Sequence, residues 1–291
     1  MSIMAQLEFA FEFSESEKKL SKYILDEGVK ILDLNSRDLA SKTYTSPATI
    51  VRLCQKIGLK GYSEFKIKYS AELQADLYKK DRINVNYPFK TEDSTETVCH
   101  NLMMLHRESI EDTFKLIDIE NLNKVVSVLY NSKKINIYGS GNSVIAGLTF
   151  QHKMMRIGRE VIIKTISGEQ IPLSYNLKKE DAAIFISYTG ESNELITIAQ
   201  IAKTKKTPII IITSIGDNAL SRMSDYVINI CSKEKIYNKI APYASKMSMD
   251  YILDIIFSLI FKKDYDENIK FKISMDTKYD KRNPHSPINE K

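Results

Sequence analysis

Two short stretches of this sequence place hydroxyl side chains around glycine, directly after runs of apolar residues. In the first stretch the apolar residues 182–186 are followed by Ser187, Thr189 and Ser192, which surround Gly190. Glycine lets the backbone come close to a ligand, and hydroxyl groups donate hydrogen bonds to anions. We therefore expect this stretch to bind an anion. The alternative is an ordinary glycine turn followed by a helix cap.

The second stretch also follows an apolar run and reads Gly139, Ser140, Gly141, Asn142 and Ser143. It does not complete a dinucleotide-binding pattern, because Val144 stands where a third glycine is needed, and the sequence contains no P-loop of the nucleoside triphosphatases. Neutral donors without a lysine or a metal suit a monophosphate better than a triphosphate. Two stretches of this kind in one sheet support each other as an anion site.

The elements that must position these stretches follow from the pattern after residue 134. Short apolar runs alternate with longer stretches of helical spacing, and the runs occupy residues 135–140, 161–166, 182–188, 208–214 and 226–230. Strands that are apolar on both faces are typical of a parallel sheet covered by helices. The sequence therefore predicts an α/β three-layer (αβα) domain. Both hydroxyl stretches then lie at carboxyl ends of strands, where helix N-termini offer free N–H groups.

Two segments near the C-terminus differ from this pattern. Residues 245–263 have helical spacing and are apolar almost all round, which predicts burial, for example in a subunit interface. Residues 274–291 have almost no core-forming side chains, and we expect a mobile tail there.

The N-terminal half shows helical spacing and no alternating run. Ser36 is expected to cap a helix that runs to Lys42, and Ser46 with Pro47 is expected to open the next helix as its cap and first residue. Residues 43–45 turn the chain between the two. Two short helices joined in this way predict an all-α helix-turn-helix domain, which is a DNA-binding layout.

The spacing also predicts which side chains of the second helix face the core and which face outward. The inward set is Ile50, Val51, Cys54 and Ile57. The outward set is Ala48, Thr49, Arg52 and Gln55. The outward set is the one that could meet DNA.

Positive charge is concentrated on this half of the chain. Between residues 42 and 68 a single acid, Glu64, faces six basic residues, namely Lys42, Arg52, Lys56, Lys60, Lys66 and Lys68. For any single lysine a solvated helix face is the alternative, but the set favours contacts with backbone phosphates by Lys56, Lys60 and Lys66. Thr49 and Arg52 could reach base edges. The predicted DNA-binding residues are Ser46, Ala48, Thr49, Arg52, Lys56 and Lys60.

Composition sets the frame for these predictions. A chain of 291 residues with 43% hydrophobic residues is long enough for two cores. We expect a helix-turn-helix domain over residues 1–80, a polar linker over 81–94, an anion-binding domain over 95–273 and the tail. The three cysteines lie far apart, which argues against disulfides and a zinc site and fits a reducing cytoplasm. We predict no metal, no cofactor, no signal peptide and no membrane partner.

At this point the sequence resembles a known family. The segments "SPATIVRLCQKIGLKGYSEFK" and "SYTGESNE", with "INIYGSGNSVIAG" and "PIIIITS" in the expected order, are similar to RpiR-type (MurR/RpiR) bacterial transcriptional regulators. These regulators carry a helix-turn-helix domain followed by a sugar isomerase (SIS) domain. The resemblance covers roughly residues 1–265.

The resemblance implies a cytoplasmic homodimer or homotetramer that regulates genes of sugar metabolism and binds a pseudo-palindromic operator. A phosphorylated sugar in the SIS domain would be the effector. Carried over residue by residue, the phosphate-binding hydroxyls would be those of Ser140, Ser143, Ser187, Thr189 and Ser192. Lys246 stands near a position where family members often carry arginine, which would weaken a bidentate contact.

Two other function classes compete with a regulator. The first is a sugar-phosphate isomerase with an appended helical domain, which would need a general base and an acid. Its candidates are Glu169, Glu191, Glu194 and His152. We interpret His152 as a packed or interface histidine and the two glutamates near residue 192 as first-turn helix acids, and we assign no catalytic residue. The second class is an adaptor without a ligand. The sequence identifies neither the sugar nor the operator.

Overall fold

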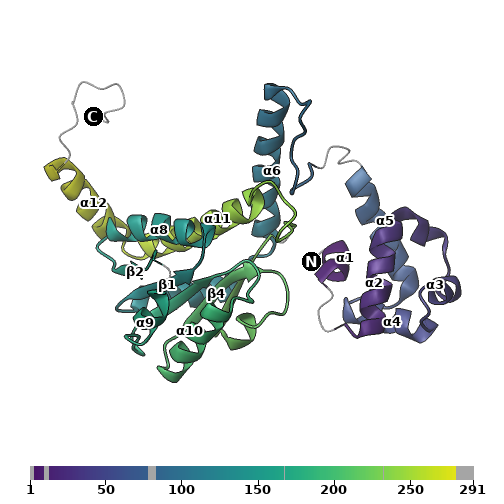
Figure 1. Cartoon of the computed structure of the whole chain (residues 1–291), viewed down its shortest axis with the longest axis horizontal. Coiled ribbons are helices and arrows are strands. Elements are labelled where there is room, and N and C mark those ends of the chain that lie inside the picture. The colour runs from purple at the N-terminus through teal and green to yellow at the C-terminus, as the bar shows by residue number, and fades with distance from the viewer. Residues whose placement is uncertain (1–2, 10–12, 78–82, 167, 232, 280–291) are drawn as a thin grey trace. The chain divides into compact units, whose positions relative to one another are not determined.

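A computed structural model describes residues 3–9, 13–77, 83–166, 168–231 and 233–279 (Figure 1). The chain divides into two compact units. The first contains the residues up to Leu105 together with 215–217 and 237–240, and the second contains the remainder. Each unit has its own hydrophobic core.

The first unit begins with a small helical head. Its α-helices are α1 (Ile3–Phe9), α2 (Glu15–Glu27), α3 (Ser36–Lys42), α4 (Pro47–Lys56) and α5 (Tyr62–Leu77), and a 3₁₀ turn, η1 (Gly28–Asp33), follows α2. Leu20 and Ile24 of α2 pack with Leu53 of α4 and with Phe65 and Tyr69 of α5 in one buried cluster. Because these residues recur at three- and four-residue spacing, each helix buries a single face.

The caps of these helices follow from the local sequence. Ser14 and Glu17 form a reciprocal capping box at the start of α2. Ser46 caps α4, with Pro47 as its first residue, as predicted. The predicted cap of α3 is wrong by one residue: Asn35, not Ser36, accepts hydrogen bonds from the first N–H groups. Asparagine and serine cap helices equally well, so the neighbouring residues Asn35 and Ser36 do not by themselves show which one is the cap.

The second unit is an αβα sandwich, as predicted. Its strands are β1 (Ile135–Gly139), β2 (Val161–Ile163), β3 (Ala182–Ile186), β4 (Ile209–Ser214) and β5 (Tyr226–Ile230). All neighbours pair in parallel in the order β2-β1-β3-β4-β5. The central strands β1 and β3 are buried along their whole length, which is why their sequences are apolar on both faces.

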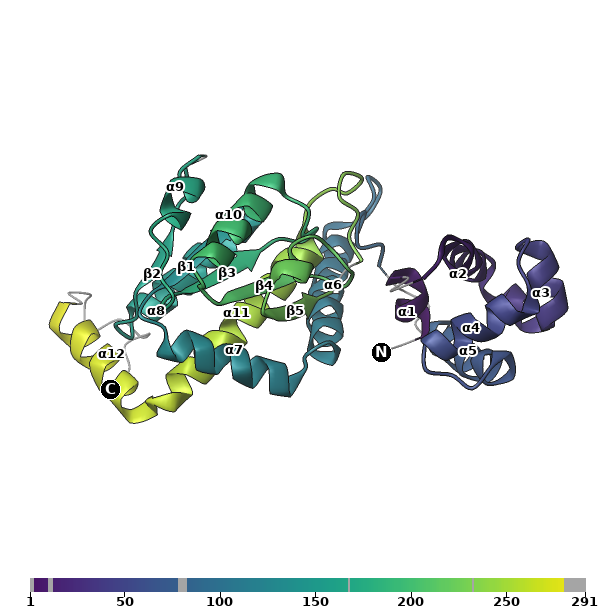
Figure 2. The same cartoon turned by 90° about the horizontal axis from the view of Figure 1, so that it is seen from below.

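Helices cover both faces of this sheet (Figure 2). The helices of this unit are α7 (Ile119–Asn131), α8 (Asn142–Met155), α9 (Gln170–Ser174), α10 (Asn193–Thr204), α11 (Tyr243–Lys263) and α12 (Tyr265–Tyr279), with a short 3₁₀ turn η2 (Ser221–Met223). One core cluster joins the sheet to α7, α8 and α11, and another joins the opposite face to α10. Helix α6 (Thr95–Lys115) begins in the first unit and ends in the second.

Three predictions about segments can be compared with these elements. Helix α11 buries one face, including Ile252 and Ile256, as the predicted burial requires, whereas Asp254 on another face is exposed; burial in a subunit interface stays a prediction. Helix α12 continues past Ser274, where the tail was predicted to begin, and residues 280–291 lie outside the described part. Residues 83–94 of the predicted linker contain no helix or strand. Among the described residues no helix is long and apolar enough to cross a bilayer.

Candidate functional site

The two hydroxyl stretches meet at one edge of the sheet. Strands β1 and β3 are neighbours, and Gly139 at the end of β1 pairs with Ile186 at the end of β3. The stretch after β1 leads into α8, and the stretch after β3 leads into α10. The five predicted ligand residues therefore come from two adjacent loops and two helix starts, the arrangement that collects anions in open α/β sheets.

The loop after β3 uses its hydroxyl oxygens as internal acceptors. The Ser187 hydroxyl accepts a hydrogen bond from the Gly190 N–H at 3.2 Å, and the Thr189 hydroxyl accepts one from the Glu191 N–H at 3.3 Å. Because a hydroxyl has one donor and two acceptor positions, these bonds leave both O–H protons free to donate; Thr189 is half-buried and Ser187 is buried. Ser192 is the N-cap residue of α10, but its side chain makes no capping hydrogen bond.

Gly190 is the tightest point of this loop. Its φ is +66°, a left-handed conformation that glycine adopts without strain, and an added Cβ would lie 2.0 Å from the Asn218 side-chain oxygen. Asn218 is 4% exposed, donates to the Thr213 hydroxyl at 3.2 Å and accepts from the Ser221 N–H at 2.9 Å. Gly190 is thus backed by a third loop, which follows β4.

The loop after β1 presents its two serines differently. Ser140 is exposed, and Gly141, with φ +54°, is the N-cap residue of α8. The Ser143 side chain is buried, and its hydroxyl donates to the Met249 sulfur of α11 at 3.8 Å. Thioether sulfur is a weak acceptor, so this is a weak bond. Ser140 is the exposed hydroxyl of this loop, whereas the Ser143 N–H donates to the Ser140 carbonyl at 3.1 Å and the Val144 N–H to the Gly141 carbonyl at 3.1 Å.

Several residues that support the site carried no signal in the sequence. The buried Gln170 side chain accepts from the Gly139 N–H at 3.1 Å and donates to the Gly139 carbonyl at 2.7 Å, which fixes the end of β1. The Tyr188 hydroxyl donates to the Glu234 carbonyl at 2.9 Å and accepts from the Glu234 N–H at 3.0 Å. The buried Glu234 carboxylate accepts from the Ala244 and Ser245 N–H groups at the start of α11. All three act through contacts distant in sequence.

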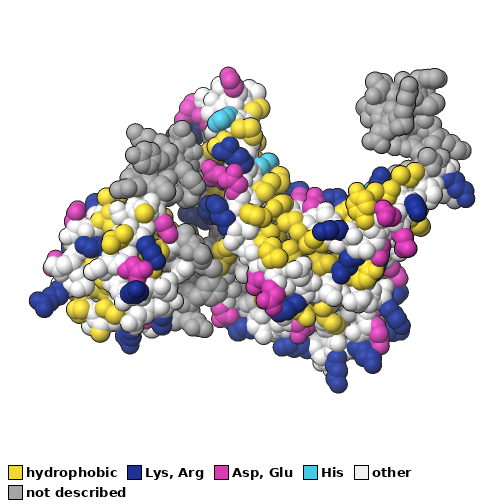
Figure 3. Space-filling view, turned by 180° about the vertical axis from the view of Figure 1, so that it is seen from behind, with side chains coloured by type: hydrophobic (Ala, Val, Ile, Leu, Met, Phe, Trp, Pro, Cys, Tyr) yellow, Lys and Arg dark blue, Asp and Glu magenta, His cyan; other side chains and the backbone are white. Residues whose placement is uncertain are grey.

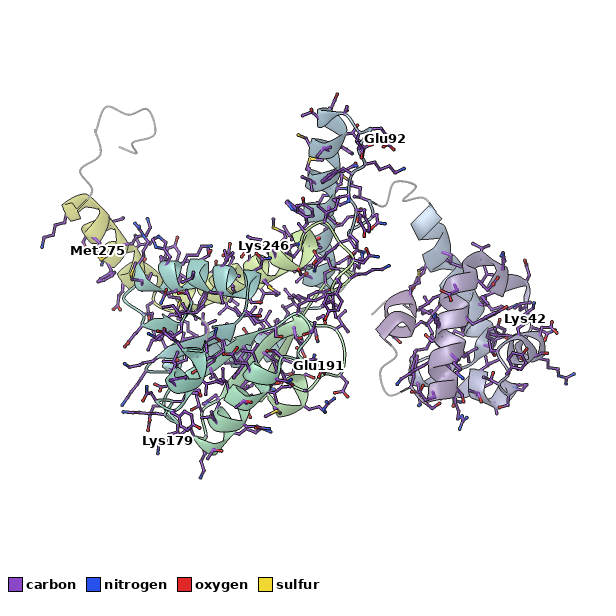
Figure 4. All side chains as sticks on the ribbon, viewed as in Figure 1. Lys42, Glu92, Lys179, Glu191, Lys246 and Met275 are labelled. Carbon is purple, nitrogen blue, oxygen red and sulfur yellow. The ribbon has the colours of Figure 1, made fainter. Side chains whose placement is uncertain are left out.

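Three of the charged candidates, Lys246, Glu191 and Glu169, have partners, and Glu194 lies in the first turn of α10. Lys246 pairs with Asp250 at 2.6 Å, and Figure 4 labels Lys246 on α11 and Glu191 on the loop after β3. The Glu191 carboxylate accepts from the Ala219 N–H at 2.9 Å. The Glu169 carboxylate lies 3.6 Å from the Lys164 ammonium. The described residues contain no cluster of metal-ligating side chains.

His152 was interpreted as a packed or interface histidine. Within this chain its side chain is exposed, so it is not packed in the core, and a role in an interface stays a prediction. It lies on α8 beside the buried Phe150 and Met154, and its place in the helical turn directs it away from them.

In the head, α3 and α4 form the predicted helix-turn-helix. Ser46, Ala48, Arg52 and Lys56 are exposed on it, and Lys60 is exposed in the connection between α4 and α5. Two predictions of orientation on α4 are wrong. Thr49 is 5% exposed rather than outward, and Val51 is 37% exposed rather than inward. The buried face of α4 is rotated from the predicted one because Leu53, which was not in the predicted inward set, lies in the core with Ile50 and Cys54.

The buried Thr49 side chain helps to position Arg52 through a hydrogen bond. The Thr49 hydroxyl lies 3.0 Å from the Ser46 hydroxyl and accepts from an Arg52 guanidinium N–H at 3.3 Å. Arg52 itself is exposed and lies two turns from the cap of α4. The cap and the arginine are thus joined through one buried hydroxyl, which restricts where the guanidinium points.

Two of the predicted phosphate-binding lysines have partners inside the head. Lys56 pairs at 2.8 Å with Glu17, which is 2% exposed. Burial raises the pKa of Glu17, but the bonds from Lys56 and Ser14 outweigh it and hold the pKa below its ordinary value. The Lys66 ammonium donates to the Leu32 carbonyl at 3.1 Å. Lys60 is exposed, and Figure 4 labels a further basic residue, Lys42, at the end of α3.

Two more side chains of the head differ in burial: Cys54, which was predicted to face inward, and Tyr44, which was not singled out in the sequence. Burial raises the pKa of the Cys54 thiol to about 12, so this cysteine is a protonated core residue at neutral pH. Tyr44, in the turn between α3 and α4, is 97% exposed and has a φ of +52°.

Comparison with known proteins agrees with this architecture. A model of the helix-turn-helix domain of the rpiR family matches residues 1–76, and a model of the SIS domain matches residues 128–257. An HTH-type transcriptional regulator from Caldanaerobacter subterraneus subsp. tengcongensis is 30% identical over 91% of this chain and 92% of its own length. Another, from Clostridium perfringens, is 28% identical over 94% of this chain and 97% of its own.

Solved structures give the same result for the fold. NanR of Vibrio vulnificus, determined in complex with ManNAc-6P, is similar with a TM-score of 0.59 and 25% identity, over 94% of this chain and 96% of that chain. The sugar isomerase domain of an RpiR transcription factor from Sphaerobacter thermophilus is similar in fold, with a TM-score of 0.55 and 14% identity over 62% of this chain and 98% of that chain. The chain is a transcriptional regulator and belongs to the RpiR family, with an N-terminal helix-turn-helix domain and a C-terminal SIS domain.

Proposed function

We propose that this regulator binds operator DNA through α4 and that a phosphorylated sugar, bound at the carboxyl edge of β1 and β3, controls that binding. The observation that carries the proposal is the pairing of Gly139 with Ile186, which brings two glycine- and hydroxyl-containing loops and two helix N-termini to one place. The structure of the relative NanR, 25% identical, is of a complex with ManNAc-6P, which supports a sugar phosphate as the ligand class here.

In this site the phosphate is held by neutral donors. Ser187 and Thr189 donate their O–H protons, which their internal hydrogen bonds leave available, and Ser140 and Ser192 border the same loops. The N-termini of α8 and α10 add N–H groups and the positive ends of their dipoles. Ser143 joins them when its hydroxyl leaves the Met249 sulfur, a weak acceptor that costs little to exchange.

On the DNA side, Arg52 reads base edges while Lys60 and the exposed surface of Lys56 contact phosphates. Ser46 and Ala48 lie at the start of α4, the end that enters a major groove in helix-turn-helix proteins. Thr49 contributes by orienting Arg52 through its buried hydroxyl. The protein binds DNA as a symmetric homo-oligomer, so its operator is pseudo-palindromic.

The second unit offers apolar surface for such an assembly. Ile145 and Met155 of α8 and Phe271 and Ile273 of α12 are exposed, and Figure 3 shows hydrophobic side chains gathered on this unit between α6 and α12 in that view. Exposed apolar patches on a folded unit mark interaction sites. Turnover of the sugar is not part of this function: Glu169 and Glu191, two of the acids considered for an isomerase, already have partners.

A panel of sugar phosphates tests the ligand class. A ligand at about 100 times its dissociation constant stabilises the native protein by about 2.7 kcal/mol, so thermal shifts identify it. The double variant Ser187→Ala/Thr189→Ala should bind it at least about tenfold more weakly, because each hydroxyl donates to a charged group. Thr197→Ala is the matched control, since that hydroxyl bonds a helix carbonyl of α10.

The same variants separate the two halves of the proposal. Without ligand, the double variant should bind DNA upstream of its own gene as the wild type does, because the head has its own hydrophobic core and neither substituted residue belongs to it. Release from DNA should need at least about tenfold more sugar phosphate. If the double variant were released from DNA at the same sugar phosphate concentrations as the wild type, that result would show that these hydroxyls do not hold the effector.

A further inference from the structure

Tyr44 occupies a backbone position that glycine normally fills. It lies two residues after Lys42, the last residue of α3, and there the Tyr44 N–H donates to the Ser41 carbonyl at 3.3 Å and the Thr45 N–H donates to the Ala40 carbonyl at 2.9 Å. These two bonds are the Schellman ending of a helix, which requires a left-handed residue, and Tyr44 has φ +52°. A tyrosine there is strained relative to glycine.

The side chain gains nothing from the head in return for this strain. Tyr44 is 97% exposed, whereas Tyr62 and Tyr69 of the same head lie in its core. An aromatic ring normally contributes to stability by burying its surface. Tyr44 therefore strains the backbone and leaves an aromatic ring in solvent, and neither is offset within the head. This combination points to a contact outside the chain.

Its surroundings indicate what that contact is. Tyr44 lies between α3 and α4, two residues before the cap of the helix that carries Arg52. Lys42, two residues earlier, is exposed and basic. A phenol in this position is a neutral hydrogen-bond donor with a long reach, and DNA phosphates accept such bonds from tyrosine.

We propose that Tyr44 contacts the DNA backbone, its phenolic O–H donating to a phosphate oxygen that flanks the groove occupied by α4. The proposal rests on the proposed DNA binding by α4 and adds a residue to it. Because the donor is neutral, the contact releases no additional counterion. Because a phosphate carries no sequence information, the contact strengthens binding to all duplexes alike.

Tyr44→Phe, which removes only the hydroxyl, tests the contact. Its affinity for DNA from upstream of the gene and for an unrelated duplex of equal length should fall together, by about tenfold, as expected for one hydrogen bond to a charged group. The dependence of affinity on salt should keep its slope. Lys60→Ala gives the contrast, because loss of one cationic contact lowers that slope by about one.

A second pair of variants removes the backbone strain and is followed by melting temperature and DNA affinity. Lys206 is the other described non-glycine residue with positive φ, at +58°, and it ends α10 in the same way, with the Thr207 N–H bonded to the Ala202 carbonyl at 3.1 Å. Tyr44→Gly and Lys206→Gly should each raise the melting temperature of the unit concerned by a few degrees. Only Tyr44→Gly should weaken DNA binding, so that stability and affinity move in opposite directions.

The outcomes are distinct. Wild-type affinity in both Tyr44→Phe and Tyr44→Gly would overturn the contact, and so would a loss confined to the specific duplex, since that is the signature of base recognition. Equal loss of DNA affinity in Lys206→Gly would also overturn it, because the effect would then be global. Failure of the wild-type protein to bind any DNA would instead refute the proposed function, before Tyr44 is tested.

Discussion

Replacing Gly190 by alanine should destabilise the SIS domain strongly, and the structure gives the size. A left-handed alanine costs about 1 to 2 kcal/mol relative to the ordinary helical conformation. The new Cβ would lie 2.0 Å from the Asn218 oxygen, so the Asn218 side chain must move and give up its bonds to Thr213 and Ser221. Those two bonds contribute about 1 kcal/mol each. Alanine also restricts the unfolded chain, which offsets up to about 1 kcal/mol. We expect a net loss of about 3 kcal/mol, from the sum of these terms.

Urea unfolding followed by circular dichroism, without ligand, measures this loss, because the chain has no tryptophan for fluorescence. Gly158→Ala is the control: Gly158 also has positive φ, at +72°, but its nearest neighbour to an added Cβ is Phe271 at 3.7 Å, an ordinary contact. It should cost about 1 kcal/mol.

A double-mutant cycle with Asn218→Ala isolates the collision. In that background the Gly190→Ala change should cost only its backbone strain, a coupling of about 2 kcal/mol. Equal losses for the Gly190 and Gly158 variants, or no coupling with Asn218, would refute the reasoning and show that the loop after β4 does not constrain the loop after β3.

The other predictions concern charge, thiols and assembly. Arg52→Ala should relax sequence preference and cost about 1 to 3 kcal/mol of operator binding, and unchanged operator affinity by fluorescence anisotropy would contradict a base contact. The pKa of Glu17 is lowered in the folded protein, so its stabilising effect is present above the ordinary glutamate value of 4.5 and lost as pH falls below the folded value. The difference in unfolding free energy between wild type and Glu17→Gln should therefore be constant above about pH 4.5 and shrink below it. At pH 8 a thiol reagent should label Cys99 rapidly and the two buried cysteines only after unfolding, and labelling of all three in the native protein would contradict their burial. Sedimentation should give a dimer or larger species at micromolar concentration, and a monomer would exclude the apolar surface of α8 and α12 as a strong interface.

The strands could be predicted from the sequence because each is a short, nearly uninterrupted apolar run. The runs at 182–188 and 208–214 contain β3 and β4, and a parallel arrangement was the simplest way to bury both faces. That arrangement alone placed Ser187 and Ser140 at one edge. The family resemblance rested on the same residues, so both arguments reached one architecture.

Details that depend on contacts distant in sequence could not be predicted. Asn218, Gln170 and Glu234 support the site from other loops, and nothing in their neighbouring residues marks them. On α4 the inward face was misjudged because Thr49 and Val51 are both β-branched and stand close in sequence, and only packing against α2 and α5 decides which is buried. Helix α12 has weak apolar spacing, so its length could not be predicted from the sequence either.

The bonds around Tyr188 bear on the thermodynamics of ligand binding. The Tyr188 carbonyl accepts from the Ser214 N–H at 3.1 Å, while its hydroxyl is held on both sides by the main chain of Glu234. The Gly190 carbonyl accepts from the Leu220 N–H at 3.1 Å. A loop held at successive residues has little conformational freedom left to lose, so the site is organised before the effector arrives. Binding energy then need not be spent on ordering this loop, and calorimetry should record a small entropic penalty even though the contacts are polar.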